Sequence, residues 1–209
     1  MAASTAENFR AFIAIALEPA LVTELQKLQR QLQAELPEGA VRWTKAEQLH
    51  LTLRFLGKVS GENRDRLTTA LHCACDGTRS FQLALQEIGC FPNTRNPRVV
   101  WVGIRGDLDP LRRLQQRIEL ETREFGDSSE ERTFQPHLTV GRVRIFGKEA
   151  RSVGETVERA TVPNLGVWMV RRIGLVQSTL APQGARYTTL ASINLMDDSA
   201  ESPLSPPAP

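Results

Sequence analysis

One short pattern that occurs twice constrains the fold of this chain more than any other feature. Residues 50–58 read His-Leu-Thr-Leu-Arg-Phe-Leu-Gly-Lys, and residues 137–143 read His-Leu-Thr-Val-Gly-Arg-Val, followed shortly by Phe-Gly-Lys at 146–148. Two of the three histidines therefore stand in the same His-Leu-Thr-apolar context. A weak internal repeat of this kind predicts two related lobes that face each other, with one His-x-Thr strand in each.

The rest of the chain alternates between strand and helix patterns. Apolar runs and period-two alternation predict strands over 10–17, 41–43, 50–56, 80–91, 99–104, 137–144, 167–176 and 187–195. Helical spacing predicts helices over 20–35, 62–75, 108–125, with Asp107 as the cap, and 148–159. Many connections between strands are too short for a helical crossover, which favours an α+β fold. We expect residues 1–196 to form a single bilobal domain and the proline-rich residues 197–209 to be a disordered tail.

Composition and charge narrow the class of protein. The 209 residues are 41% hydrophobic and 24% charged, as in ordinary folded soluble proteins. No stretch approaches the roughly 20 apolar residues of a membrane helix, and the N-terminus does not read as a secretory signal. With a net charge of +2, any attraction to phosphate must be local. Cys73, Cys75 and Cys90 lack a disulfide spacing, so we expect reduced thiols in a cytoplasmic protein, and nothing indicates an obligate partner surface, so we expect a monomer.

Each His-x-Thr pair places an imidazole and a hydroxyl on one face of a strand, His50 with Thr52 and His137 with Thr139. Two imidazoles that face one groove suit phosphoryl chemistry. A neutral imidazole takes a proton from an attacking hydroxyl or water, and a protonated one donates to the leaving alkoxide. The threonine hydroxyls can donate hydrogen bonds to non-bridging phosphate oxygens. This set requires no metal and suits a strained cyclic phosphodiester, but the residues alone do not assign the acid and the base.

A metal site is the competing interpretation of these histidines. Threonine is a poor zinc ligand, and no carboxylate or cysteine stands at a matching spacing. The third histidine, His72, lies beside Cys73 and Cys75 in a predicted helix, where residues two apart do not share a face. We therefore predict no metal site.

Arg54 and Arg142 follow the two histidines and are candidates for binding an anionic substrate, although each could equally be a solvated charge. Alternation from His50 points Arg54 towards the groove. Arg142 should point away unless a bulge intervenes near Gly141. Trp43, Phe55 and Trp101 could stack a base, but aromatic residues on strands more often belong to the core.

The segments 50–57 and 136–142 resemble the two signature motifs of the 2H phosphoesterase superfamily, and within it those of the RNA 2′,3′-cyclic phosphodiesterases, historically called 2′-5′ RNA ligases. The resemblance also covers 10–15, 98–103 and 176–187. It implies a bilobal fold of two pseudo-symmetric lobes of antiparallel sheet, with helices outside and a central active-site groove. It implies hydrolysis of an RNA-terminal 2′,3′-cyclic phosphate to a 2′-phosphomonoester without metal or cofactor. In that mechanism His50 is the proton donor and His137 the proton acceptor, while Thr52 and Thr139 hold the phosphate.

Other functions stay open at this point. The same site could carry out ATP-independent 2′-5′ RNA ligation as a side activity, since the chain has no Walker-type loop. The near-neutral charge leaves room for small 2′,3′-cyclic nucleotides in place of RNA ends such as tRNA fragments. A third alternative is an RNA-binding module without turnover, against which the second intact His-x-Thr pair argues.

Overall fold

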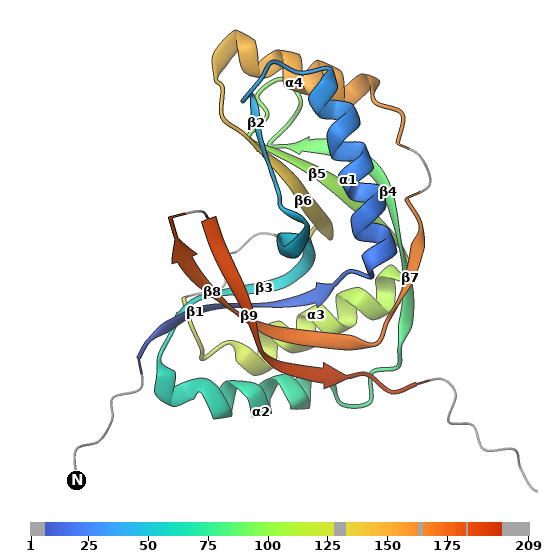
Figure 1. Cartoon of the computed structure of the whole chain (residues 1–209). Helices are drawn as coiled ribbons and strands as arrows, with labels where there is room; N and C mark the ends of the chain where they lie inside the picture. Colours follow the sequence, from blue (N-terminus) through green and yellow to red (C-terminus); the bar gives the residue numbers. More distant parts are fainter. Residues whose placement is uncertain (1–6, 128–132, 163–164, 183, 198–209) are drawn as a thin grey trace, which may run out of the picture.

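The computed structural model describes residues 7–127, 133–162, 165–182 and 184–197 (Figure 1). The helices are α1 (Pro19–Ala34), α2 (Arg64–Cys75), α3 (Leu108–Thr122) and α4 (Gly147–Arg159), with short 3-10 turns at Ala46–Gln48 and Gly61–Asn63. The strands are β1 (Phe9–Ala16), β2 (Val41–Trp43), β3 (His50–Val59), β4 (Phe81–Phe91), β5 (Val99–Gly106), β6 (His137–Val143), β7 (Val167–Val170), β8 (Arg172–Ala181) and β9 (Gly184–Asn194). Nearly every predicted element is therefore present.

The strands form two sheets, and each sheet holds one His-x-Thr strand. A four-stranded sheet has the order β3-β1-β8-β9, and a five-stranded sheet has the order β2-β6-β5-β4-β7. All pairings between these strands are antiparallel. The sheets are not consecutive halves of the chain, because β2 joins the second sheet while β8 and β9 return to the first. The α+β class with two antiparallel lobes is confirmed.

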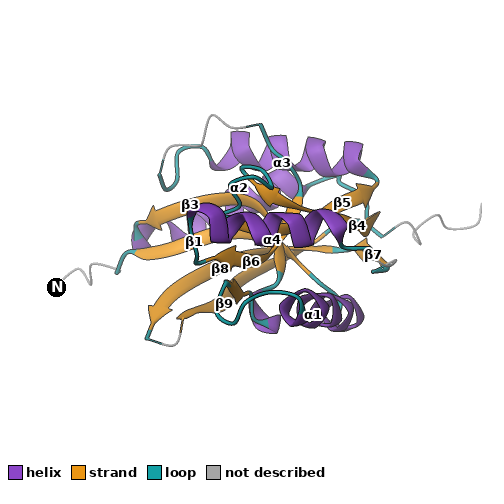
Figure 2. Ribbon diagram, turned by 90° about the horizontal axis from the view of Figure 1, so that it is seen from above, coloured by secondary structure: helices purple, strands orange, loops and turns teal. Residues whose placement is uncertain are grey.

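Helices cover the outer side of each sheet (Figures 1 and 2). α2 and α3 contact strands of the four-stranded sheet, and α4 contacts β4 of the five-stranded sheet. α1 lies against the five-stranded sheet, where the Gln29 side chain reaches the backbone of Val140. Four leucines of α1, at the spacing predicted from the sequence, are buried: Leu21, Leu25, Leu28 and Leu32.

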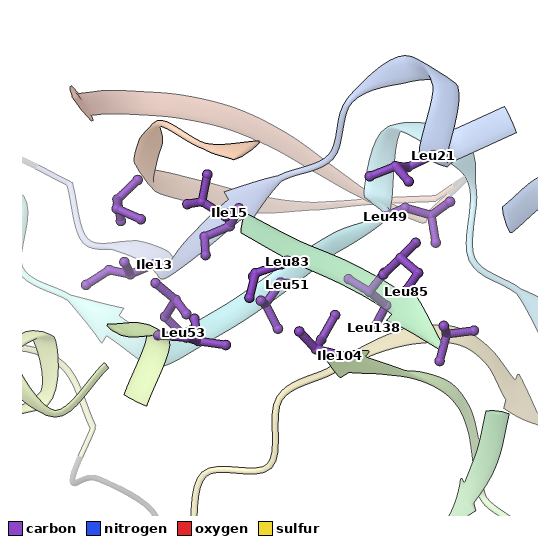
Figure 3. Close-up of a cluster of buried hydrophobic side chains, with 14 of the residues drawn as sticks. Ile13, Ile15, Leu21, Leu49, Leu51, Leu53, Leu83, Leu85, Ile104 and Leu138 are labelled. Carbon is purple, nitrogen blue, oxygen red and sulfur yellow. The ribbon is translucent and has the colours of Figure 1, made fainter. Parts of the chain in front are cut away.

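The buried side chains of the two sheets belong to one hydrophobic cluster (Figure 3). Leu51 of β3 and Leu138 of β6, which directly follow the two histidines, are both fully buried in it. Side chains alternate across a strand, so the histidines and threonines of both motifs point away from this shared core. The same cluster therefore fixes the orientation of both motifs.

Three details differ from the sequence prediction. The predicted strand 167–176 is two strands, β7 and β8, which separate at Arg171 because one pairs with β4 and the other with β1. β3 does not end at Gly57 but runs to Val59, with Gly57 at φ +65° in an irregular stretch of the pairing. The Asp107 side chain does not cap α3, because its carboxylate accepts a hydrogen bond from the Gln82 backbone N–H at 2.8 Å.

Other predictions can be checked only in part. None of the helices among the described residues is both long and apolar enough to cross a membrane. Cys73, Cys75 and Cys90 are free thiols, as predicted. The predicted tail lies outside the described residues from position 198 onwards.

Candidate active site

Both histidines are oriented by the same backbone hydrogen bond. Nδ1 of His50 lies 2.7 Å from the carbonyl oxygen of Gln48, and Nδ1 of His137 lies 2.7 Å from the carbonyl oxygen of Gln135. A carbonyl oxygen only accepts hydrogen bonds, so Nδ1 of each ring carries the proton and donates it. In each neutral ring Nε2 is then left as a lone-pair acceptor, and in each protonated ring it is a donor.

The threonines lie on the same side of their strands as the histidines, and we call this side of β3 and β6 the histidine face. Thr52 and Thr139 are both half-buried, and neither hydroxyl has a hydrogen-bond partner among the described residues. β3 and β6 contact each other although they belong to different sheets. The structure therefore places two imidazoles and two available hydroxyls on adjacent strands.

A β-bulge follows each motif at the same position, three residues after the histidine. In β3, Ile13 and Ala14 of β1 pair with Arg54 and Thr52, so Leu53 is the extra residue. In β6, the pairing with β5 likewise skips Val140. The burial pattern of the first five residues is identical in the two strands. Because a bulge shifts the alternation by one residue, the fifth residue after each histidine returns to the histidine face.

This bulge overturns the prediction for Arg54. Its guanidinium points away from the histidine face and is buried beneath α3, where Nε donates to Glu119 at 3.1 Å and Nη1 donates to the Thr122 hydroxyl. Arg54 therefore joins a strand to a helix and does not reach the substrate side. Simple alternation failed here because Leu53 adds one residue to the strand.

The corresponding bulge brings Arg142 to the histidine face, as the sequence allowed if the strand bulged near Gly141. Arg142 pairs with Val99 of β5 and with Arg42 of β2, and both arginines are exposed. Of the two arginines predicted to bind substrate, only Arg142 stands on the side of the histidines.

Aromatic rings surround His50, and the sequence analysis did not single out two of them. Phe12 stacks on the imidazole with ring centroids 4.6 Å apart, and Tyr187 meets it edge-on at 5.5 Å. Burial lowers the pKa of His50, and the backbone hydrogen bond to Gln48 opposes that change. His137 instead meets the edge of Phe91 at 4.9 Å. The two imidazoles therefore share a tether and differ in environment.

Gln29 is a further residue that the sequence analysis missed. Its side-chain amide is buried and donates to the carbonyl oxygens of Val140 and Thr44 at 2.8 and 2.9 Å. It thereby pairs the backbone at the bulge that follows Thr139. A signal existed in the sequence, because Gln29 is a polar residue on the apolar, leucine-lined stripe of a predicted helix.

The three aromatic residues predicted as possible stacking partners for a base do not all lie on the histidine face. Phe55 is 67% exposed and lies on the histidine face, 6.3 Å from Phe12 between ring centroids. Trp43 packs against the core. Trp101 pairs with Thr139 and therefore lies on the histidine face, where its ring covers Gly89 and lies 5.3 Å from Phe91 between ring centroids. Within the described residues, no group of three or more His, Cys, Asp or Glu side chains is arranged to hold a metal ion.

Comparison with known proteins gives a consistent picture. Residues 15–101 match the family model described as LigT like Phosphoesterase. The chain is 30% identical over 187 residues to the RNA 2′,3′-cyclic phosphodiesterase of Methanothermobacter thermautotrophicus, covering 89% of this chain and 98% of that protein. It superposes with a TM-score of 0.73 on the structure of a Thermus thermophilus protein (25% identity, 90% and 99% coverage). The TM-score is 0.71 for Escherichia coli LigT complexed with 3′-AMP (28% identity, 90% and 99% coverage).

Proposed function

The chain belongs to the LigT-like 2H phosphoesterases of the RNA 2′,3′-cyclic phosphodiesterase family, and we propose that it hydrolyses RNA-terminal 2′,3′-cyclic phosphates to 2′-phosphomonoesters by two-histidine acid–base catalysis. One observation carries this proposal. Two His-x-Thr strands from different sheets carry identical Nδ1 tethers, which leave both Nε2 atoms free for proton transfer. No metal or cofactor is needed for this chemistry.

In the proposed reaction Nε2 of His137 takes a proton from water as the water oxygen attacks phosphorus. The bond between phosphorus and the 3′-oxygen breaks, and Nε2–H of His50 gives its proton to that oxygen. The product carries a 2′-phosphomonoester and a free 3′-hydroxyl. The proton has moved from one imidazole to the other by way of the reactants, and exchange with solvent resets the pair. Each transfer contributes roughly 10²–10⁴-fold to the rate.

The threonine hydroxyls stabilise the phosphate during this reaction. Thr52 and Thr139 are the available donors nearest in sequence to the histidines, and both lie on the histidine face. Negative charge builds on the non-bridging oxygens as water attacks, so hydrogen bonds from hydroxyls that already point there strengthen in the transition state.

The environment of His50 also fits a general acid that becomes protonated when the anionic substrate binds beside it. In the free protein, burial lowers the pKa of His50 and favours the neutral ring. An anionic cyclic phosphate bound beside the ring favours the imidazolium, because an opposite charge within a few ångströms stabilises it. Protonation of His50 and binding of the anionic substrate therefore favour each other.

The first experiment incubates the purified protein, with excess EDTA, with a short RNA that ends in a 2′,3′-cyclic phosphate, and identifies the product by phosphorus NMR. A 2′-phosphomonoester formed in the presence of the chelator is the expected result. Turnover only after addition of zinc or manganese would show that the histidines are metal ligands. No turnover under either condition would favour the binding module.

A substrate with sulfur in place of the bridging 3′-oxygen tests the assignment of the two histidines. A thiolate leaves without protonation, so this substrate does not need the acid. The rate of His50→Ala should recover on the sulfur substrate by about 10²-fold or more relative to the oxygen substrate, while His137→Ala should stay slow. The reverse pattern would exchange the two roles.

The proposal includes three further features of the protein: one bilobal domain over residues 1–196, a monomeric state, and a cytoplasmic location. The hydrophobic cluster that spans both sheets supports a single folding unit. The unpaired, buried Cys75 and Cys90 support a reducing compartment. Light scattering of the full chain tests the monomer.

A further inference from the structure

The side chain of Gln48 joins the turn before the first motif to the β8–β9 hairpin. Gln48 ends the 3-10 turn Ala46–Gln48, and its Nε2 lies 2.6 Å from the carbonyl oxygen of Ala185 in β9. A carbonyl oxygen only accepts hydrogen bonds, so the side-chain amide of Gln48 is the donor. A Cβ placed on Gly184, the preceding residue, would lie 3.9 Å from the same Nε2 atom. The amide therefore lies beside two consecutive residues of the hairpin.

This hydrogen bond connects opposite edges of one sheet. β3 and β9 are the outer strands of the order β3-β1-β8-β9. Two other strands separate them, yet β9 contacts the turn Ala46–Gln48 that leads into β3. The hairpin therefore curves over the side of the sheet that carries His50, and in Figure 1 it rises beside this turn.

Gln48 also holds the imidazole of His50. Its backbone carbonyl oxygen accepts the Nδ1–H of His50 at 2.7 Å, while its side chain holds the hairpin two residues before Tyr187. The Tyr187 ring meets the imidazole edge-on with ring centroids 5.5 Å apart, and it meets the Phe12 ring edge-on at 4.9 Å. One residue therefore fixes both the ring of the proposed acid and the strand that covers this ring.

The contact with Tyr187 affects His50 because it contributes to the burial of the imidazole. Burial is the largest cause of the lowered pKa of His50, and no charged side chain of the described residues contributes to it. Tyr187 itself faces the positive charges of Arg142 and Arg42, which oppose the rise that burial causes in its own pKa. Since Tyr187 stands on the hairpin, its contact with His50 depends on where Gln48 holds that hairpin.

The second motif has the same backbone tether without a hydrogen bond from the glutamine side chain. Gln135 precedes His137 by two residues, as Gln48 precedes His50, and both carbonyl oxygens lie 2.7 Å from Nδ1. The Gln135 side chain is exposed and makes no hydrogen bond with any of the described residues. The tether therefore does not require the side-chain amide, and the amide of Gln48 has a separate role in the first motif.

We propose that Gln48 is a positioning residue for the acid of the proposed reaction: its amide holds the β8–β9 hairpin so that Tyr187 packs against His50 and keeps water from this imidazole. The inference rests on the proposed function, in which His50 protonates the leaving 3′-oxygen. A general acid must be held within hydrogen-bond reach of the atom that it protonates, and small displacements lower the rate. A hairpin released from Gln48 leaves the imidazole more exposed and less precisely held.

The test compares Gln48→Met with Gln135→Met in the full chain. Methionine is close to glutamine in size but donates no hydrogen bond, and both variants keep the backbone carbonyl that holds Nδ1. Proton NMR of the free protein follows the His50 signal, which is identified by its loss in His50→Gln. Its midpoint should rise towards 6.5 in Gln48→Met and stay at the wild-type value in Gln135→Met. On a cyclic-phosphate RNA end, kcat should fall by about 3- to 10-fold in Gln48→Met alone, the range for one hydrogen bond.

Tyr187→Ala tests whether the effect of Gln48 passes through the tyrosine. This variant should raise the His50 midpoint at least as far as Gln48→Met does. Adding Gln48→Met to it should raise the midpoint no further, because both changes remove the same contact. An unchanged midpoint in Gln48→Met, equal effects of Gln48→Met and Gln135→Met, or additive shifts in the double variant would overturn the inference. Inactivity of the wild type together with the expected midpoints would overturn the proposed function alone and leave Gln48 as the residue that holds Tyr187 against His50.

Discussion

β3 and β6 are alike up to the third residue after their histidines and differ from the fourth onwards. Each histidine donates Nδ1–H to the carbonyl oxygen two residues earlier at 2.7 Å, and each strand bulges three residues later. A glutamine from a covering helix approaches each bulge carbonyl: Gln29 lies 2.8 Å from the carbonyl oxygen of Val140, and Gln115 lies 3.4 Å from that of Leu53. The repeat therefore preserves backbone geometry as well as two side chains.

The difference begins with the side chains that follow the bulges. At the fourth position β3 carries Arg54, buried against α3, and β6 carries Gly141, which has no room for a Cβ beside Val41. At the fifth position, on the histidine face, β3 presents Phe55 and β6 presents Arg142. At this position β3 therefore presents an aromatic ring to the histidine face and β6 presents a cationic side chain. In the proposed reaction the shared histidines and threonines perform the chemistry, and we expect the divergent positions to bind the substrate.

The largest effect is expected at the shared histidines. His50→Ala and His137→Ala should each lower kcat/KM on a cyclic-phosphate RNA end by roughly 10²–10⁴-fold. The double variant should be little slower than either single variant, because the two residues act as a unit. His72→Ala, at the exposed third histidine, is the control and should match the wild type. Wild-type activity in either single variant would break the two-histidine comparison.

The two glutamines test whether both bulges need support. Gln29→Met removes two hydrogen bonds, one to the buried Val140 carbonyl and one to the partly buried Thr44 carbonyl, and should lower the free energy of unfolding by about 1–3 kcal/mol. It should also lower kcat, since Thr139 would be less precisely held. Gln115→Met removes only a 3.4 Å contact and should change both quantities far less. Urea unfolding and steady-state kinetics measure the two effects, and equal losses in both variants would contradict the distinction.

Substitution of Arg54 should mainly lower stability, whereas substitution of Arg142 should mainly affect activity. Arg54→Met leaves Glu119 without its partner at the β3–α3 contact, so the free energy of unfolding should fall by about 1–3 kcal/mol. The Glu119 side chain is 33% exposed and can be rehydrated, which keeps this loss below that of a fully buried pair. Arg142→Met should leave stability nearly unchanged and raise KM. A rise in KM for Arg54→Met at unchanged stability would show that Arg54 contributes to substrate binding.

The sequence was sufficient for those features that depend on periodicity. The alternation around His50 and His137 placed both His-x-Thr pairs on one face of their strands, and the leucine spacing located α1 within one residue at each end. It failed for Arg54, because a bulge leaves no mark on an alternating pattern and depends on pairing with β1. The break at Arg171 escaped prediction for the same reason, since the choice of sheet is made by distant strands.

Residues brought in from other strands were the hardest to predict. Phe12 and Tyr187 surround His50, yet they are 38 and 137 positions away from it in the sequence. Nothing in their local patterns indicates a site, because an aromatic residue on a strand usually belongs to the core. Their positions follow only from the order β3-β1-β8-β9.

A smaller effect is expected at Phe55, the aromatic counterpart of Arg142. If a base stacks on this ring, Phe55→Ala should raise KM for RNA ends by roughly 5- to 10-fold, at the low end for aromatic stacking because the ring is largely exposed. kcat should change little. Phe146→Ala is the matched control, since Phe146 is 65% exposed but lies outside the two motifs. An equal KM for Phe55→Ala and wild type would show that no base stacks on this ring.

The smallest effect concerns protonation of His50. Its pKa is lowered below the ordinary value of 6.5 in the folded protein, mainly by burial, so the native state binds fewer protons than the unfolded chain between the two values. Stability should therefore fall as the pH drops from above 6.5 through the lowered pKa, and His50→Gln should remove that part of the loss. Proton NMR of the imidazole should give a midpoint below 6.5 in the free protein. A nucleoside 2′-monophosphate should raise this midpoint, because the bound anion stabilises the imidazolium. A midpoint at or above 6.5 without ligand would mean that the surrounding rings of Phe12 and Tyr187 do not desolvate this imidazole.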